Sequence, residues 1–237
     1  MSLSVTIRKR LKFIDLDMAF ECSDGRVLVM IGPSGGGKTS IIRMLAGLDA
    51  PDEGIITFHD QVWFDSSRRI NVPPRKRRLG YVFQDYTLFP HLNLYDNAAF
   101  AAVNKKDVDD LFELFSIGHL RTRKPGKVSG GERQRCAICQ AMARRPQVLL
   151  LDEPFSALDA MTRRVLREEL KNLKGRFSFP IVYVTHDVNE ALYLADEMLP
   201  VVQGKTDEGW MKKMTARNRQ GGKASRAARE TKLALVY

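Results

Sequence analysis

The stretch GPSGGGKT, which runs from Gly32 to Thr39, fits the pattern G-x-x-x-x-G-K-[ST] of a phosphate-binding loop. Glycines let the backbone curl closely around a phosphate chain, with its N–H groups pointing inward. The apolar run at residues 26–31 predicts a buried strand before the loop, and residues 38–46 predict a helix that ends at Gly47. A strand, a glycine loop and a helix in this order are what such a site requires, so we expect bound phosphates here.

Individual residues of the loop are suited to different ligands. The Lys38 ammonium can reach the β- and γ-phosphates of a nucleotide, and the Thr39 hydroxyl can ligate Mg²⁺. The positive end of the helix that begins here adds to the attraction. The residues predicted to bind the nucleotide in this loop are Gly32, Pro33, Ser34, Gly35, Gly36, Gly37, Lys38, Thr39 and Ser40.

Composition restricts the class of protein. The 237 residues are enough for one large α/β domain or two small ones, and 44% hydrophobic with 28% charged residues is ordinary for a globular chain. No apolar run approaches the roughly 20 residues that would span a bilayer, and the N-terminus lacks the apolar core of a secretion signal. With three cysteines and no such signal, the chain is expected in a reducing cytoplasm.

The net charge of +10 is unevenly spread along the chain. Residues 205–237 contain nine Lys and Arg against three Asp and Glu, so this segment alone carries +6. A basic tail of this kind can touch nucleic acid or an anionic membrane surface, although such tails are more often simply solvated. Its apolar periodicity is weak, and we expect it to be loosely ordered or independently docked.

Strand patterns dominate the beginning of the chain. Residues 3–7 and 11–20 alternate apolar and polar side chains and predict two antiparallel strands joined by the basic turn at residues 8–10. A turn at residues 51–54 leads into a second predicted hairpin at residues 55–64. These hairpins are expected to form an antiparallel layer of their own.

The middle of the chain is predicted to be partly helical. A charged loop at residues 73–78 leads into a short buried strand at residues 79–83. Residues 97–117 have a helical pattern that Gly118 can end, and the sequence VSGGE at residues 128–132 opens a further helix that runs to about residue 144.

Strands and helices alternate in the last part of the domain. We expect a strand at residues 148–151, a charged helix at residues 161–173, a strand at residues 181–185 and a helix at residues 189–198 that Asp187 or Asn189 can cap. Such alternation predicts a mostly parallel sheet with helices packed on it.

Polar side chains follow the predicted buried strands. Asp152 and Glu153 end the strand at 148–151, at the carboxyl edge where open α/β sheets bind ligands. Asp152 suits a Mg²⁺ partner, directly or through water, and Glu153 suits a base that polarises an attacking water. Gln84 follows another strand and can contact metal or water, but an ordinary polar loop residue is equally consistent. His186 could bond a γ-phosphate, although alone it is a neighbour of a helix cap.

The segment Ser129-Gly130-Gly131 also has an anion-binding geometry, because a serine and two glycines stand at a helix start. It lacks the lysine of a complete phosphate loop. One complete and one partial phosphate site in a single chain suggest that two copies meet face to face and that each completes the site of the other.

Together these motifs resemble the nucleotide-binding subunit of ABC transporters over about residues 3–204. The matching elements are GPSGGGKT as Walker A, Gln84 as the Q-loop, VSGGE as the signature, LLLDEP as Walker B, SALD (Ser156 to Asp159) as the D-loop and His186 as the H-loop. Residues 73–91 are more narrowly similar to the ATPases of molybdate-type oxyanion importers and of the wider group that includes sulfate importers.

The resemblance implies a fold, a division of the chain and a set of ligands. The fold would be an α/β P-loop NTPase of the ABC ATPase type, with a mostly parallel sheet, an N-terminal antiparallel layer and a small helical subdomain at about 97–145. The ATPase domain would span 1–204, and 205–237 would be a basic tail. Many importer ATPases of this kind carry a C-terminal regulatory β-domain, and this stretch is too short for one, so none is expected. ATP and Mg²⁺ would be the cofactors. The implied site residues are Glu153, His186 and Gln84 for catalysis, Thr39, Gln84 and Asp152 for the metal, and Ser129, Gly130 and Gly131 for the nucleotide of the second copy.

The resemblance also implies partners. Two subunits would sandwich two ATP molecules and drive an integral-membrane permease from the cytoplasmic face of the membrane, with an extracytoplasmic solute-binding protein in the same system. The expected function is ATP hydrolysis that energises import of a small solute, an oxyanion such as molybdate. The alternative is a soluble ABC ATPase that acts on nucleic acid or ribosomes through the basic tail. One set of motifs and the short insertion at 97–127 argue against it, so nucleic acid is not expected as a partner. A third alternative, a non-catalytic nucleotide-binding scaffold, conflicts with the intact Lys38, Asp152, Glu153 and His186.

Three positions depart from the family pattern. The signature has Val128 in place of leucine and Glu132 in place of glutamine, and the carboxylate adds negative charge near a γ-phosphate. The family carries an aromatic residue for the adenine base in the first hairpin turn. The turn predicted here is basic, with Phe13 the nearest aromatic, so an arginine could stack on the base instead.

Overall fold

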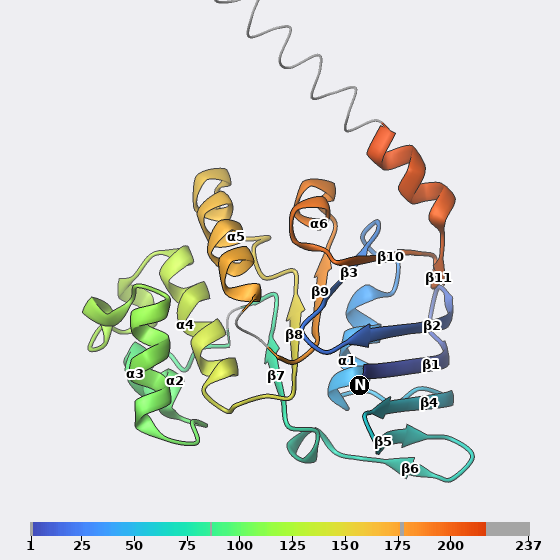
Figure 1. Cartoon of the computed structure of the whole chain (residues 1–237), viewed down its shortest axis with the longest axis horizontal. Coiled ribbons are helices and arrows are strands. Elements are labelled where there is room, and N and C mark those ends of the chain that lie inside the picture. The colour runs from blue at the N-terminus through green and yellow to red at the C-terminus, as the bar shows by residue number, and fades with distance from the viewer. Residues whose placement is uncertain (1, 86, 176–177, 217–237) are drawn as a thin grey trace, which may run out of the picture.

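The computed structural model describes residues 2–85, 87–175 and 178–216, and it contains two sheets (Figure 1). The first sheet is antiparallel, with the strand order β2-β1-β4-β5-β6. Its strands are β1 Ser2–Arg10, β2 Asp15–Ser23, β4 Glu53–Phe58, β5 Gln61–Asp65 and β6 Ile70–Asn71. The two N-terminal hairpins therefore form the antiparallel layer that their alternating pattern predicts.

The second sheet has the order β11-β10-β3-β9-β8-β7, and its strands run parallel except for β11. The strands are β3 Val27–Ile31, β7 Leu79–Val82, β8 Val148–Asp152, β9 Ile181–Thr185, β10 Glu197–Val202 and β11 Lys205–Thr206. Every residue of β3, β8 and β9 is buried, as expected for central parallel strands that are covered on both faces. The predicted α/β architecture is thus confirmed.

Helices cover both faces of the parallel sheet. They are α1 Lys38–Ala46, α2 Leu94–Ala99, α3 Lys105–Leu114, α4 Gly130–Met142, α5 Ala160–Lys174 and α6 Val188–Leu194. Alternate residues of each strand serve different cores: Leu28 and Met30 pack with α1 and the antiparallel sheet, whereas Val27 and Val29 pack with the helices of the other face. In Figure 1, α2, α3 and α4 gather beyond β7, and the antiparallel sheet lies at the opposite end.

The first hairpin turn differs from the prediction. Strand β1 continues through Arg10, and the chain turns at residues 11–14, where the Leu11 amide donates to the Ile14 carbonyl at 2.9 Å. The basic residues belong to the strand because acidic neighbours lie across from them; Arg8, for example, is 3.3 Å from Asp17. The correction moves Phe13 into the turn itself, where its side chain is 86% exposed.

The predicted helix at 97–117 is also wrong in its extent, because the chain forms two helices there. Asn104 caps α3 by accepting from the Asp107 amide at 2.8 Å, which ends any continuation from α2. Helix α3 ends at Leu114, and Ser116 adopts a positive φ of 54°. Gly118 therefore begins a short 3-10 turn and does not end a helix.

The predicted helix at 189–198 ends early, at Leu194, and Glu197 begins β10. Long-range pairing of β10 with β3 outweighs the local helical pattern, and Asp196 accepts from the Val27 amide at 2.8 Å at the start of this pairing. The cap at Asp187 is confirmed, since its side chain accepts from the amides of Asn189 and Glu190.

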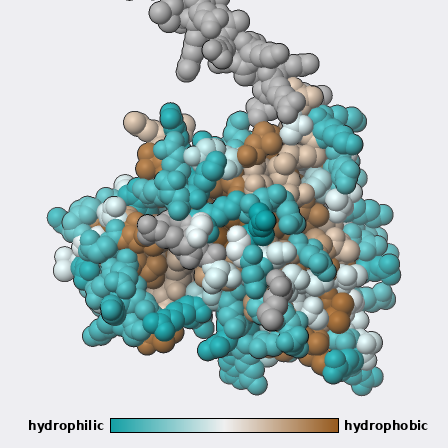
Figure 2. All heavy atoms as spheres, in the orientation of Figure 1, coloured by the Kyte–Doolittle hydropathy of each residue, from teal (hydrophilic) through white to brown (hydrophobic). Residues whose placement is uncertain are grey.

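Part of the segment expected as a basic tail is attached to the sheet. Residues 205–206 form β11, residues 208–216 are helical, and Trp210 and Met211 pack against the helix-covered core. Residues 217–237, the rest of the expected tail, lie outside the described residues. Within the described part of the chain, no helix is both long and apolar enough to cross a bilayer. The face in Figure 2 is largely hydrophilic, and apolar side chains gather on it in separate patches.

Arg77, which belongs to the predicted charged loop at residues 73–78, is buried with 1% of its surface exposed. Its guanidinium donates to the Met44 and Leu45 carbonyls at 2.7 and 2.8 Å, which belong to the last turn of α1. A third bond reaches the Val72 carbonyl at 2.8 Å. Arg77 thus satisfies the C-terminal carbonyls of the helix that carries Lys38. Burial lowers the pKa of its guanidinium to about 10, so the side chain stays charged at neutral pH.

Replacing Arg77 by Met should lower the free energy of unfolding by about 2–4 kcal/mol, because the buried carbonyls of α1 lose their donors. Chemical denaturation of the purified chain measures this change. Lys76→Met is the matched control: Lys76 is the exposed neighbour, and its loss should change stability by less than about 0.5 kcal/mol. Equal effects of the two substitutions would contradict the assigned role of Arg77.

Candidate functional site

The glycine loop connects β3 to α1, and two of its glycines are required by geometry. Gly37 adopts a φ of 100°, a left-handed conformation that side chains disfavour, directly before the first residue of α1. Gly32 lies against β10, where an added Cβ would overlap the Val201 carbonyl oxygen. The loop is therefore held against the sheet with the N-terminus of α1 facing outward, as an anion site requires.

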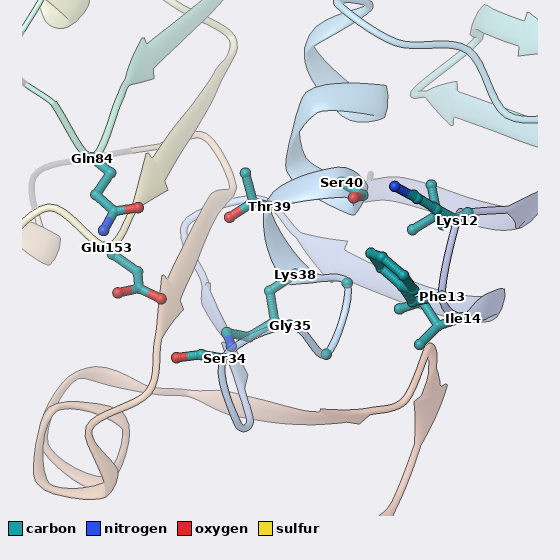
Figure 3. Close-up of a pocket in the computed structure, with 13 residues that line it drawn as sticks. Lys12, Phe13, Ile14, Ser34, Gly35, Lys38, Thr39, Ser40, Gln84 and Glu153 are labelled. Atoms are coloured by element: carbon teal, nitrogen blue, oxygen red, sulfur yellow. The ribbon is translucent and has the colours of Figure 1, made fainter.

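Lys38 is the first residue of α1, and its side chain is folded back over the loop. Its ammonium donates to the Gly32 and Pro33 carbonyls, both at 2.9 Å. Burial lowers the pKa of Lys38, and the charges of Glu153 and Asp152 partly offset that effect. Figure 3 shows the amine beside Ser34 and Gly35, at the position where a phosphate chain would lie along the loop.

Asp152, at the end of β8, is buried and holds two hydroxyl groups. Its Oδ1 accepts from the Thr39 hydroxyl at 3.2 Å, and its Oδ2 accepts from the Tyr81 hydroxyl at 3.1 Å. Burial raises the pKa of Asp152, and these two hydrogen bonds oppose the rise. Thr39 and Asp152 together supply hard oxygen donors at the start of α1, which is the donor chemistry that Mg²⁺ prefers. The residues present therefore fit that ion.

Glu153 and His186 form a pair at the same sheet edge. The Nδ1 atom of His186 lies 2.9 Å from Oε2 of Glu153. Since an ionised carboxylate only accepts hydrogen bonds, Nδ1 carries the proton in this contact. Glu153 has a positive φ of 45°, and its amide donates to the Val184 carbonyl at 3.0 Å. This unusual backbone conformation turns the carboxylate away from the strand and toward the glycine loop.

A cavity of about 500 Å³ is lined by Lys38, Thr39 and Glu153, whereas Asp152 and His186 do not line it and are hydrogen-bonded to Thr39 and Glu153. Figure 3 shows Gln84 and Glu153 on one side of the glycine loop and Phe13 on the other. The lining residues are Leu11, Lys12, Phe13, Ile14, Ser34, Gly35, Gly36, Gly37, Lys38, Thr39, Ser40, Gln84 and Glu153. The structure thus brings most of the predicted site residues to one cavity, and it adds the residues of the first hairpin turn.

Ser129, Gly130 and Gly131 do not line this cavity. Ser129 caps α4, where its hydroxyl donates to Glu132 at 2.8 Å and the Glu132 carboxylate also accepts from the Ser129 amide at 2.7 Å. These hydrogen bonds lower the pKa of Glu132 and keep it charged. Glu132 thus completes a reciprocal cap with Ser129 at the start of α4, a role that a glutamine can also fill.

The sequence analysis did not identify a partly buried arginine, Arg163, beside Glu153 and His186. Arg163 on α5 donates to the Leu158 carbonyl at 3.0 Å and lies 3.7 Å from Asp187 and 3.9 Å from Glu190. Glu190 in turn accepts from the Thr185 hydroxyl at 2.7 Å. Arg163 therefore ties the segment after Asp152-Glu153 to the segment that carries His186. Its only signal in the sequence is its place on a charged helix, which does not distinguish it from its neighbours.

A groove of about 460 Å³, here called the aromatic groove, lies beside β7. Its lining residues are Ala46, Leu48, Pro74, Arg75, Leu79, Gly80, Tyr81, Phe83, Thr87, Phe89, Phe100, Ala101, Gln140, Ala141 and Arg144. The Phe89 and Phe100 rings lie 4.7 Å apart between centroids. Buried Asn97 fixes this loop, because it accepts from the Phe89 amide at 2.7 Å and donates to the Phe89 carbonyl at 3.1 Å.

Comparison with known proteins agrees with these motifs. The model of the ABC transporter family matches residues 16–156. The chain is 41% identical over 205 residues to the molybdenum import ATP-binding protein of Photobacterium profundum, covering 86% of this chain and 57% of that protein. It is also 41% identical over 204 residues to the sulfate/thiosulfate import ATP-binding protein of Yersinia pestis, covering 81% and 54%. A third relative, the trehalose/maltose import ATP-binding protein of Thermococcus litoralis, is 41% identical over 196 residues, covering 79% and 53%.

Solved structures give the same fold. A dimeric bacterial ABC transporter cassette matches with a TM-score of 0.72 and 25% identity, covering 88% of this chain and 97% of that one. A subunit of a Clostridium perfringens ABC transporter complex matches with a TM-score of 0.77 and 24% identity, covering 91% and 93%. The chain spans a little over half the length of the curated relatives described above. The family match extends over more than half of the chain and includes the glycine loop and Asp152-Glu153, so this protein belongs to the ABC transporter family.

Proposed function

We propose that this chain is the ATP-hydrolysing subunit of an ABC importer, with ATP and Mg²⁺ as its cofactors. One observation carries the proposal: the glycine loop, Asp152 and the Glu153–His186 pair meet at a single edge of the parallel sheet. Nucleotide hydrolysis needs a loop that binds the phosphates, a ligand for the metal and a base for the attacking water, all close to one another. The import ATP-binding proteins at 41% identity support the same assignment.

Each side chain has a defined part in the proposed reaction. Lys38, which donates to the Gly32 and Pro33 carbonyls, would donate instead to the β- and γ-phosphates of a bound nucleotide. Thr39 and Asp152 would hold Mg²⁺, which neutralises charge on the phosphates when bound. Glu153 orients and polarises the attacking water, and His186 keeps its carboxylate in place through Nδ1. Gln84, exposed on the rim, contributes an amide to the same water and metal region.

The proposed active unit contains two copies of the chain. Ser129, Gly130 and Gly131 stand at the N-terminus of the 13-residue helix α4, outside the cavity of their own copy. In a face-to-face dimer they would bind the γ-phosphate held by the other copy. Glu132 keeps the Ser129 hydroxyl oriented until the nucleotide of the second copy arrives.

Phe13 is proposed to stack on the nucleotide base. Its ring is exposed in the turn at residues 11–14 and lines the cavity at the end opposite Glu153 (Figure 3). The basic residues that were expected in this turn are instead paired with acidic residues of the sheet. We therefore propose that the base stacks on Phe13 and not on an arginine.

Phe13→Ala should weaken ATP binding about ten-fold, since stacking of a base on an aromatic side chain contributes about 1–3 kcal/mol. Phe13→Trp should retain the affinity, because a ring remains. Titration calorimetry with ATP measures both variants. Phe100→Ala is the matched control: it removes an exposed ring that lies outside the cavity, and it should leave ATP affinity within two-fold. An unchanged affinity in Phe13→Ala would contradict the stacking role.

The aromatic groove is the proposed docking surface for an integral-membrane permease, at the cytoplasmic face of the membrane. Phe89, Phe100 and Leu48 give it an apolar floor, and Arg75 and Arg144 give it positive charge. A short amphipathic helix of a permease loop, with an acidic residue, complements both features. Two of the three relatives described above are named for the import of molybdenum and of sulfate/thiosulfate, which supports an oxyanion such as molybdate as the proposed solute. An extracytoplasmic solute-binding protein is a further proposed partner.

Phosphate release from ATP by the purified chain tests the function directly. Hydrolysis should require Mg²⁺ and stop in EDTA, and the activity per chain should rise with protein concentration as shared sites assemble. Ser129→Arg should abolish hydrolysis while leaving ATP binding within about three-fold, because Ser129 lies outside its own cavity. Absence of hydrolysis at every concentration would contradict the proposed function, whereas activity independent of concentration in a single-copy protein would contradict only the shared site.

A further inference from the structure

The side chain of Tyr81 contacts both Asp152 in the nucleotide site and the aromatic groove. It is the third residue of β7, on the face of the sheet that packs toward α1. Its hydroxyl donates to Oδ2 of Asp152 at 3.1 Å, across 71 residues of sequence. Tyr81 is also one of the residues that line the aromatic groove. A single rigid side chain therefore touches the metal-binding carboxylate and the proposed permease surface.

Tyr81 holds the oxygen of the Asp152 carboxylate that Thr39 does not contact. The Thr39 hydroxyl holds Oδ1, and the Tyr81 hydroxyl holds Oδ2. Two donors on different oxygens define the rotation of the carboxylate, since hydrogen bonds weaken steeply outside a narrow range of distance and angle. Loss of the Tyr81 contact would leave Asp152 held at Oδ1 alone. Groups behind a metal ligand commonly set its orientation and affinity in this way.

At the groove, the Tyr81 ring packs on Phe83, with 4.0 Å between ring centroids. Phe83 immediately precedes Gln84, and both aromatic residues line the groove together with Leu48 and Phe89. A segment that enters the groove therefore contacts this ring pair. Because the phenol ring is rigid and has two rotatable bonds, a shift of the ring is transmitted to the hydroxyl at its far end.

We propose that Tyr81 is a positioning residue that makes the orientation of Asp152, and hence metal binding in the nucleotide site, respond to the packing of the aromatic groove. The proposal rests on the proposed function, since it assumes that Asp152 serves a divalent cation beside ATP. It links the groove to the site through the Tyr81 hydroxyl and Asp152. The ring of Tyr81, held by Phe83, keeps Asp152 in the orientation that binds the metal.

The role of Tyr81 in orienting Asp152 for metal binding can be tested with Mn²⁺ in place of Mg²⁺, because binding is measured and turnover is not needed. The Glu153→Gln chain with saturating ATP is titrated with Mn²⁺, and free Mn²⁺ is counted by electron paramagnetic resonance. Adding Tyr81→Phe should weaken Mn²⁺ binding about ten-fold, because loss of a group that supports a metal ligand typically lowers metal affinity by about 10–100-fold. ATP binding in EDTA should change less than two-fold, because Tyr81 is not a lining residue of the nucleotide cavity.

Tyr183→Phe is the matched control. It removes a tyrosine hydroxyl that donates to another buried carboxylate, Glu190, at 3.0 Å on the neighbouring region of the same sheet. Mn²⁺ affinity should stay within two-fold in this variant. If Tyr81→Phe binds Mn²⁺ like the parent chain, or if Tyr183→Phe weakens it equally, the positioning role of Tyr81 is overturned. If the parent chain itself binds no Mn²⁺ with ATP, the proposed function fails instead.

A double-mutant cycle tests the link to the groove. Phe83→Ala removes the ring that holds Tyr81 and should weaken Mn²⁺ binding about three-fold, part of the effect of the lost hydroxyl. In the Tyr81→Phe background the same substitution should have no further effect, because both act through one hydrogen bond. A Phe83→Ala effect that persists in that background would place its action on Gln84 and would overturn the proposed route.

Discussion

Replacing Glu153 by Gln is expected to lower the rate of ATP hydrolysis about a thousand-fold while leaving ATP binding intact, because the amide cannot accept the proton of the attacking water. The contact with His186 can persist in this variant, since the amide oxygen still accepts from Nδ1. Phosphate release and ATP affinity are measured on the same preparation. With hydrolysis blocked, ATP should also hold two copies together, which light scattering detects as a doubled mass.

The matched control for this substitution is Glu168→Gln. Glu168 lies on α5 in an exposed pair with Arg164, and its loss should leave turnover within two-fold. Undiminished phosphate release in the Glu153→Gln chain would remove Glu153 from the catalytic role and leave it as a structural partner of His186.

Lys38→Ala should weaken ATP binding about a hundred-fold, because two charge-assisted hydrogen bonds to the β- and γ-phosphates are lost from a buried position. The cavity holds a second lysine for comparison. Lys12 lies at the Phe13 end, exposed to solvent, and Lys12→Ala should change the affinity less than about three-fold. Titration calorimetry with ATP distinguishes the two. Similar losses in both variants would indicate general electrostatic attraction, not a specific phosphate contact.

Local patterns were sufficient for the elements that form the site. The fully buried strands before Gly32, Asp152 and His186 are short apolar runs with turn residues after them, and parallel strands bring such ends to one edge. The sequence alone therefore predicts that the glycine loop, the two acids and the histidine lie at one edge of the sheet.

Most of the features that the sequence patterns did not predict depend on contacts between residues that are distant in sequence. The basic residues of β1 look like a turn until Asp17 and Glu53 are placed opposite Arg8. Arg77 looks like a surface residue because its acceptors, Met44 and Leu45, lie in a different element. The role of the Tyr81 hydroxyl likewise depends on its hydrogen bond to Asp152, and no periodic pattern in the sequence connects these two residues.

The prediction of a single helix at 97–117 was wrong for a different reason, because the break between α2 and α3 has a local cause. Asn104 followed three residues later by Asp107 is a recognisable start of a helix. The apolar periodicity of residues 97–117 continues across the break, and the pattern alone therefore merges two helices that share one buried face.

If this chain powers a membrane permease, the ATP-bound Glu153→Gln protein should bind that permease. Tagged Glu153→Gln chain with ATP is mixed with detergent-solubilised membranes of the native host, and the copurifying proteins are identified, with a Phe89→Ala/Phe100→Ala variant as the control for the aromatic groove. A polytopic membrane protein should be recovered with Glu153→Gln and lost when the groove residues are changed. Recovery of ribosomal or DNA-associated proteins alone would contradict it.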